Sequence, residues 1–308
     1  MTDISNFMHL GISPAALFST YQTDPLSHLL AVKACAELEN YDTLELLLPD
    51  DESIRKKEIE IIKAHGKRLN YNAPAQTQVE GPFDPASPDK NIRQNARDFI
   101  KRHVGYALEG DAGLFMMTGC ADRGEKDRGE VMARFEDHFF TCAAYCKENG
   151  LAVVLEPLER DRFKKIVLGP TRECADFIIK MQKSGLTNAH LMIDTAHLPL
   201  MGETFADALS HTLKASMAHL HLGDAVLGDE NSPYYGHTHP PVEIQGGVFD
   251  TEYLKEVLKS LFDAGYLDKS GAKKANVSFE MSPYPGVSPE LSAQVAYEKL
   301  KFALNSII

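Results

Sequence analysis

The stretch HLMIDTAHLPLMGE, residues 190–203, changes from apolar to polar within a few positions. Its first part is a short apolar run that ends at Asp194, and His197 follows three residues later. A short apolar run of this length is consistent with a strand that is buried in a core. The stretch therefore predicts a buried strand whose carboxyl end carries an acid and, just beyond it, an imidazole.

Similar runs recur along the whole chain, and helix-length amphipathic segments separate them. The predicted strands are residues 8–13, 43–48, 67–72, 113–118, 151–156, 189–194, 217–222 and 276–281. The predicted helices are residues 25–39, 50–66, 90–110, 126–149, 170–184, 203–215, 250–265 and 288–305. Asp250 and Ser288 are suited to be helix N-caps, because their side-chain oxygens can accept hydrogen bonds from the first free N–H groups.

Eight strand-then-helix units in one chain predict parallel strands joined by right-handed crossovers. Eight such units close into a (β/α)₈ TIM barrel, and the chain length of 308 residues suits one barrel domain spanning residues 1–308. A doubly wound open sheet is the alternative. The count of eight and the lack of a glycine-rich phosphate loop after an early strand favour the barrel.

Three long segments follow predicted strands: residues 73–90, rich in proline and glycine, the charged segment 119–130, and the longest, 223–250. Barrels of this class build their active sites from the loops at the carboxyl ends of the strands. Loops of more than about 15 residues usually carry function. We therefore expect a pocket at this face of the barrel, covered by long loops.

The composition excludes several classes of partner. The formal charge of −12 repels phosphate backbones and anionic lipids, so we expect neither nucleic acid nor membrane to bind. No apolar run approaches the ~20 residues of a membrane span, and the N-terminus lacks the pattern of a signal peptide. The five cysteines form no CxxC pair and are expected to be buried thiols, as in a cytoplasmic protein.

Four consecutive predicted strands carry a polar side chain at or near the carboxyl end: Glu156, Asp194, His221 and Glu280. Each acid alone is explained equally well as a cap of the following helix. Together, however, the four residues all lie at the carboxyl ends of strands, which converge in a closed barrel. Burying three carboxylates side by side is costly without a counter-charge, and one divalent cation supplies it. Three oxygen ligands and one imidazole suit Mn²⁺ first, then Mg²⁺ or Co²⁺, with Zn²⁺ ranked lower.

Further histidines lie near this predicted site. His197 follows Asp194 closely enough to reach a bound substrate, and either His237 or His239, in the loop HTHPP, is a candidate proton carrier or substrate contact. His219 shares a strand face with His221, so it either supports the ligands or is a core histidine. Glu159, just after Glu156, is a candidate second carboxylate above the metal.

The combination of Glu156, the motif IDTAH (193–197), the motif HLHLGD (219–224) and Glu280 resembles the xylose-isomerase-like barrel superfamily of sugar isomerases and epimerases. This resemblance implies a metal held by Glu156, Asp194, His221 and Glu280, and a substrate contact from His197. We expect Glu156 and Glu280 to be needed for turnover as well as for metal binding.

The chain departs from the ketose 3-epimerases of that superfamily at two places. Arg162 stands where they have a second acid, and Leu227 stands where they have an arginine. The segments HLHLGDAVLGDENSPYYGHTHPP and LEPLERDRFKKIVLGPTRE are instead similar to the large subunits of bacterial C-glycoside deglycosidases. This second resemblance implies eliminative cleavage of a 3-oxo-glycoside, with a small second subunit that completes the enzyme.

These patterns predict an enzyme that uses a divalent metal to remove a proton next to a sugar carbonyl, through an enediolate. The two departures favour eliminative cleavage of 3-oxo-glycosides, and a sugar isomerase or epimerase is the close alternative. An apurinic-site endonuclease is disfavoured by the acidic charge. A sugar-binding barrel without catalysis is disfavoured because it has no need of a buried metal set. An oligomer is expected.

Overall fold

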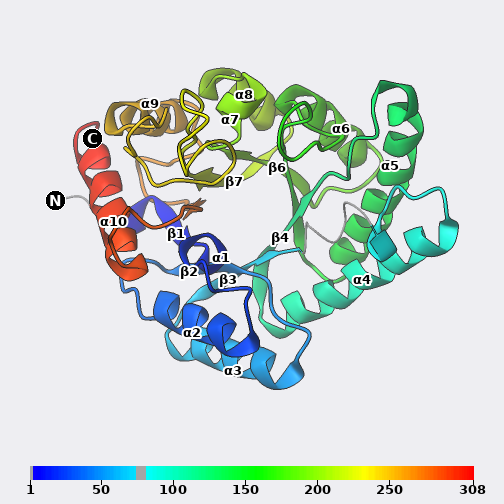
Figure 1. The fold of residues 1–308 in the computed structure, drawn as a ribbon, viewed down its shortest axis with the longest axis horizontal. Coiled ribbons are helices and arrows are strands. Elements are labelled where there is room, and N and C mark those ends of the chain that lie inside the picture. The colour runs from blue at the N-terminus through cyan, green and yellow to red at the C-terminus, as the bar shows by residue number, and fades with distance from the viewer. Residues whose placement is uncertain (1–2, 74–80) are drawn as a thin grey trace. The chain divides into compact units, whose positions relative to one another are not determined.

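The computed structural model describes residues 3–73 and 81–308. Its eight strands form a closed parallel barrel in chain order, from β1 to β8, which confirms the predicted (β/α)₈ architecture (Figure 1). The strands are β1 (Met8–Ile12), β2 (Thr43–Leu46), β3 (Arg68–Asn72), β4 (Ala112–Thr118), β5 (Ala152–Glu156), β6 (Ala189–Asp194), β7 (Met217–Leu222) and β8 (Ala275–Phe279).

Eight long helices alternate with the strands at the predicted places: α2 (Pro25–Ala36), α3 (Glu52–Ala64), α4 (Lys90–Glu109), α5 (Glu125–Glu148), α6 (Thr171–Lys183), α8 (Phe205–Lys214), α9 (Thr251–Asp263) and α10 (Pro289–Asn305). Four short elements within residues 3–73 and 81–308 were not predicted: the helices α1 (Pro14–Leu17) and α7 (Leu198–Met201) and the 3₁₀ turns η1 (Ile4–Asn6) and η3 (Gly81–Phe83). Each spans one turn or less, which is too short for a helical period to appear in the sequence.

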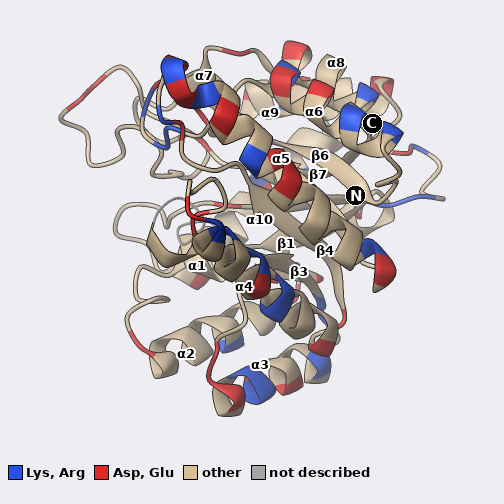
Figure 2. Ribbon diagram, turned by 90° about the vertical axis from the view of Figure 1, so that its right-hand side faces the viewer, with Lys and Arg blue, Asp and Glu red and all other residues tan. Residues whose placement is uncertain are grey.

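The predicted helix starts have the expected chemistry. The side chain of Asp250 accepts a hydrogen bond from the N–H of Tyr253, and that of Ser288 accepts one from the N–H of Leu291. In α3, acidic and basic residues alternate along the helix (Figure 2), and Lys56 pairs with Glu52 one turn earlier. Both caps and such i,i+4 pairs stabilise helices from within the local sequence.

The chain divides into two compact units. The first comprises Met1–Arg68, Asp194–Ala206 and His219–Ile308. Within it, β1 pairs in parallel with both β2 and β8, and β7 pairs with β8. On its outside α2 packs against α3, and α9 packs against α10 (Figure 1).

The second unit comprises Leu69–Ile193 and Asp207–Ala218. Here β4 pairs in parallel with β3 and β5, and β5 pairs with β6. Side chains from three of these strands form a buried hydrophobic cluster, which consists of Leu114, Met116, Val154 and Met192. The apolar runs that predicted the strands are thus the residues that the unit buries.

Other expectations concern the loops and the cysteines. Residues 74–80 of the long segment 73–90 lie outside the described residues. The charged segment 119–130 is shorter than expected as a loop, because α5 already begins at Glu125. All five cysteines are free and buried, and burial raises the pKa of the Cys120 thiol to about 12, as expected for unreactive thiols. No helix among the described residues is long and apolar enough to cross a membrane.

Candidate metal centre

Three of the predicted ligands lie together in the first unit. Asp194 is the last residue of β6, His221 lies in β7, and Glu280 directly follows β8. The N–H of Glu280 donates to the carbonyl of Leu222 at 3.1 Å, which continues the pairing of β8 with β7 by one residue. The backbone ladder therefore places Glu280 next to His221.

The side chains of these three residues converge. Nδ1 of His221 lies 2.7 Å from Oε2 of Glu280 and 3.5 Å from Oδ2 of Asp194. One candidate ligand atom from each of the three lies within 4.8 Å of the others. The Asp194 side chain is 0% exposed, whereas that of Glu280 is 24% exposed. The cluster is therefore closed on the side of Asp194 and open on the side of Glu280.

The donor set fits a divalent cation. Oδ1 of Asp194 accepts the N–H of Ala196 at 2.8 Å, but Oδ2 is buried and accepts no hydrogen bond. A buried carboxylate oxygen without a hydrogen bond is costly unless a cation satisfies it. Nitrogens of His197 and His239 lie 3.8 and 3.7 Å from this oxygen. Ligands at right angles around an ion, each about 2.1 Å from it, are about 3 Å apart. Nδ1 of His221 lies 3.5 Å from Oδ2 of Asp194 and 2.7 Å from Oε2 of Glu280, so the predicted ligands have a spacing near that of a coordination shell.

The carboxylates and imidazoles of the cluster shift one another's pKa values in opposite directions. Burial opposes ionisation of Asp194, but the nearby imidazoles outweigh it and hold the pKa of its carboxyl far below the usual range. Burial also opposes ionisation of Glu280, and His239 and His221 outweigh it and lower the pKa of that carboxyl. Conversely, burial opposes the imidazolium of His221, but Glu45 and Glu280 raise its pKa well above the ordinary value. Both carboxylates are thus ready to bind a cation.

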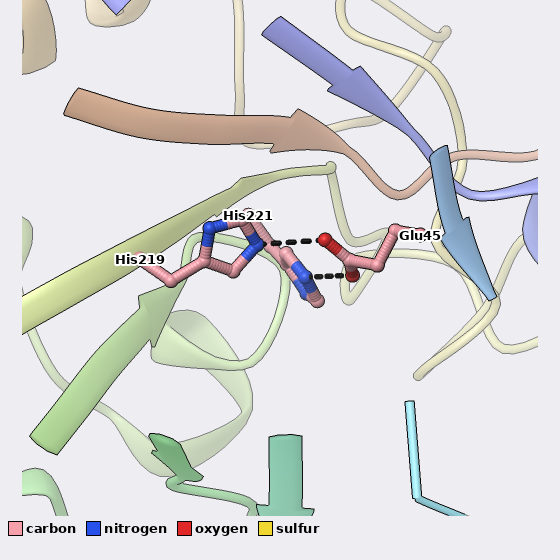
Figure 3. Close-up of side chains that lie close together, drawn as sticks. All are labelled: Glu45, His219 and His221. Atoms are coloured by element: carbon pink, nitrogen blue, oxygen red, sulfur yellow. Dashed lines mark hydrogen bonds and ion pairs between the residues drawn. The ribbon is translucent and has the colours of Figure 1, made fainter. Parts of the chain in front are cut away.

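A residue that the sequence analysis missed, Glu45 of β2, lies directly behind His221. Its side chain is fully buried, and its two oxygens meet Nε2 of His219, at 2.7 Å, and Nε2 of His221 (Figure 3). Burial opposes ionisation of Glu45, but attraction to the two imidazoles outweighs it and lowers the pKa of the carboxyl far below its usual range. His219, for which the sequence left two roles open, therefore contacts the same acid as His221.

Two of the predicted catalytic histidines join the cluster. The rings of His197 and His239 pack edge to face with centroids 4.9 Å apart. His239 has a φ of 48°, a left-handed conformation that is uncommon for residues other than glycine and that often accompanies functional sites. His237 is half-buried in the same loop and belongs to none of the three metal-type groups among the described residues. Its catalytic role stays a prediction.

The loop 223–250 is fixed where it leaves β7. A Cβ atom on Gly223 would lie 2.6 Å from the carbonyl oxygen of Glu280, so only glycine fits there without a shift. The next residue, Asp224, receives the N–H groups of Val248 and Phe249 on Oδ1 and donates its own N–H to the carbonyl of Pro240. These bonds tie the segment around His239 to the strand that carries His221.

Glu156, the fourth predicted ligand, is the last residue of β5 and lies in the second unit. It is half-buried and pairs in register with Thr118 of β4. Its position at the carboxyl end of a barrel strand is the one that the sequence predicted. Its role as a ligand stays a prediction.

Comparison with known proteins agrees with this fold. A family model described as a xylose isomerase-like TIM barrel matches residues 32–267. Among solved structures, D-psicose 3-epimerase from Clostridium cellulolyticum H10 is 18% identical, with a TM-score of 0.66 over 97% of this chain and 98% of that one.

Two further solved structures are similar over nearly the whole chain. A 3-keto-D-glucoside 4-epimerase from E. coli is 15% identical, with a TM-score of 0.67 and coverage of 97% of this chain and 99% of that one. The IolI protein with a bound zinc atom is 15% identical, with a TM-score of 0.69 and coverage of 98% and 99%. At these identities the likeness establishes the fold, and the neighbours' activities are their own.

Proposed function

The chain belongs to the xylose isomerase-like TIM barrel family, and from this premise we propose that it is a sugar isomerase or epimerase that requires a divalent metal ion. The observation that carries the proposal is the meeting of Asp194, His221 and Glu280 around a buried carboxylate oxygen that accepts no hydrogen bond. The epimerases among the structural neighbours support this reading over the eliminative cleavage that the sequence alone favoured.

Four residues are proposed to hold the metal: Asp194, His221 and Glu280, with Glu156 as the fourth. In a closed parallel barrel the carboxyl ends of all strands lie at one end, where β5 contributes Glu156. When bound, a divalent ion acts as a Lewis acid that stabilises the negative charge developing on a carbonyl oxygen. The oxygen-rich set suits Mn²⁺ first, with Mg²⁺ or Co²⁺ as alternatives.

The proposed proton carriers are the more open carboxylates. Glu280 is 24% exposed, whereas Asp194 is closed off, so Glu280 is the acid of the first unit that a substrate can reach. In the proposed reaction the Glu280 carboxylate takes the proton from the carbon next to the sugar carbonyl, and the electron pair of the C–H bond forms an enediolate. Glu156, protonated before the substrate binds, donates its proton to the opposite face of the same carbon to give the epimer, and proton exchange with water then returns both groups to their starting states.

His197 and His239 are proposed to bind and orient the substrate. His197 is nearly closed off by the protein, with 2% of its side chain exposed, and His239 is 12% exposed. Imidazole can donate to or accept from a sugar hydroxyl, according to its tautomer. The packed pair therefore offers two hydrogen-bonding rings of fixed orientation next to the carboxylates.

Eliminative cleavage of a 3-oxo-glycoside is the second candidate, because Arg162 and Leu227 stand where the ketose 3-epimerases have an acid and an arginine. One of the structural neighbours is a 3-keto-D-glucoside 4-epimerase, so the same substrate class fits both outcomes. In elimination, the electron pair of the C–H bond forms a double bond, and the group β to the carbonyl leaves with its own electron pair. A small second subunit is proposed only for this outcome.

One experiment separates the two candidates. The protein, after metal removal and reloading with Mn²⁺, is incubated in D₂O with free ketoses and with a 3-oxo-glycoside. Deuterium entering a sugar carbon without release of the aglycone supports the isomerase or epimerase. Aglycone release supports elimination, and bound metal with neither result contradicts both.

A further inference from the structure

We propose that Glu45 is a positioning residue for the metal centre: it fixes the orientation and tautomer of His221 so that Nδ1 faces Asp194 and Glu280. The inference rests on the proposed function of that site and adds a residue that lies outside the predicted ligand set.

The first support is the placement of the two ring nitrogens of His221. Nδ1 lies 2.7 Å from Oε2 of Glu280, on the side where Asp194 also lies, whereas Nε2 meets Oε1 of Glu45. Nδ1 is therefore directed at the candidate metal position, and Nε2 is directed at the carboxylate of Glu45 on the other side of the ring. A ligating histidine that donates its second N–H to a carboxylate has its ring orientation fixed and its basicity raised.

The second support is the role left to the second ring nitrogen. If Nδ1 of His221 binds a cation, it carries no proton, so the one ring proton is on Nε2, which faces Oε1 of Glu45. A carboxylate oxygen can accept this N–H, while the lone pair of Nδ1 is directed toward Asp194 and Glu280. The contact thus selects the tautomer that a cation at that position requires.

The third support is the second partner of Glu45. Nε2 of His219 lies 2.7 Å from Oε2, and the rings of His219 and His221 are nearly perpendicular, at 85° (Figure 3). The side chains of Glu45 and His219 are 0% exposed, and that of His221 is 2% exposed. Water therefore does not compete for these bonds, and the carboxylate is held at both oxygens.

A second cation among Glu45, His219 and His221 is the competing explanation, because their candidate ligand atoms also lie within 4.8 Å of one another. The 2.7 Å between Nε2 of His219 and the carboxylate is the length of a direct charge-assisted hydrogen bond, which favours positioning. Metal stoichiometry distinguishes the two explanations.

The test compares the wild-type protein with Glu45→Gln and with a matched control, Glu58→Gln. Glu58 is also fully buried against an imidazole, that of His28, but lies in α3. Glutamine keeps the shape of glutamate but cannot accept from both imidazoles. Mn²⁺ affinity is measured by calorimetry, bound metal by elemental analysis, folding by circular dichroism, and the His221 tautomer by ¹⁵N NMR of the Mg²⁺-loaded proteins.

The expected result is one ion per chain in every protein, with Mn²⁺ affinity lowered about 10–100-fold by Glu45→Gln and within about twofold of the wild type for Glu58→Gln. The His221 nitrogen signals change only in Glu45→Gln. If folded Glu45→Gln binds Mn²⁺ with the affinity of the wild type, the inference is overturned. It is also overturned if the wild type binds two ions and Glu45→Gln binds one, because Glu45 is then a metal ligand. If the wild-type protein binds Mn²⁺ but transforms no sugar, the proposed function is wrong. The Mn²⁺ affinities of the wild type and Glu45→Gln then still test the role of Glu45. Wild-type protein that binds no metal overturns both.

Discussion

Nδ1 of His221 lies 2.7 Å from a carboxylate oxygen of Glu280, and the N–H of Glu280 donates to the carbonyl of Leu222, the residue that follows His221. Together with Asp194, this pair places two carboxylates and an imidazole around one point at the end of the first unit's strands. We expect a divalent cation to bind at that point.

Metal binding should stabilise the fold. A ligand present at 100 times its dissociation constant adds about 2.7 kcal/mol to the free energy of unfolding, which corresponds to a rise in Tm of roughly 4 °C for a domain of this size. We expect Mn²⁺ to raise the Tm of the chelator-treated protein and EDTA to reverse the rise. Differential scanning calorimetry measures both, and no shift with Mn²⁺, Mg²⁺ or Co²⁺ speaks against the centre.

Glu280→Gln should abolish most of the turnover and weaken the stabilisation by Mn²⁺, because it removes both a charged ligand and the proposed proton carrier. The expected loss in kcat is at least about 10²-fold. The matched control is Glu252→Gln, at the start of α9, where the side chain is 76% exposed. Steady-state kinetics with the sugar identified by deuterium exchange measures kcat for both variants. A Glu280→Gln variant with wild-type kcat refutes the role of Glu280 as proton carrier.

Gly223→Ala should disturb the centre through the backbone. The added Cβ would lie 2.6 Å from the carbonyl oxygen of Glu280, so one of the two segments must move. We expect a loss of about 1–3 kcal/mol in the free energy of unfolding, together with weaker metal binding. Gly228→Ala is the control in the same loop, because a Cβ there meets nothing within 4 Å. Equal stability of the two variants in urea unfolding would be inconsistent with this packing.

Asp224 should make stability depend on pH. Burial raises the pKa of its carboxyl to about 7, although three backbone N–H groups lower it in part. The ordinary value, about 3.9, applies to the unfolded chain, so the folded chain binds more protons between the two values. The contribution of Asp224 to stability is therefore complete below pH ~4 and is lost as the pH rises through 7.

Asp224→Asn removes this titration. Relative to the wild type, the variant should gain about 2–3 kcal/mol between pH 5 and pH 8, because each pKa unit corresponds to about 1.4 kcal/mol. Unfolding by urea at a series of pH values measures the difference. A difference that does not vary with pH contradicts the raised pKa.

The sequence predicted every strand of the barrel and every long helix, because apolar runs and amphipathic segments alternate and local caps such as Asp250 fix the helix starts. It also predicted Asp194, His221 and Glu280 as neighbours, since strand ends converge in any closed barrel. Topology alone was enough for these residues, because their position follows from strand order and not from loop conformation.

Glu45 was missed because it lies inside a strand and not at its end. The sequence did contain a sign of its role, because Glu45 is an acid within the apolar run TLELLL, residues 43–48. An acid in a buried run needs a buried partner. The partner, His219, is 174 residues away along the chain, so only the closed barrel reveals the pair. Similarly, the choice of His239 over His237 as the histidine beside Asp194 depends on the backbone of one loop, including the left-handed φ at His239.

An anomalous-difference map from crystals of the protein grown with Mn²⁺ shows directly whether a cation binds among these residues. We expect one peak about 2.1 Å from a carboxylate oxygen of Asp194, from Nδ1 of His221 and from a carboxylate oxygen of Glu280, with Glu156 completing the set. Absence of a peak at saturating Mn²⁺, or a peak that these three residues do not contact, would contradict this expectation.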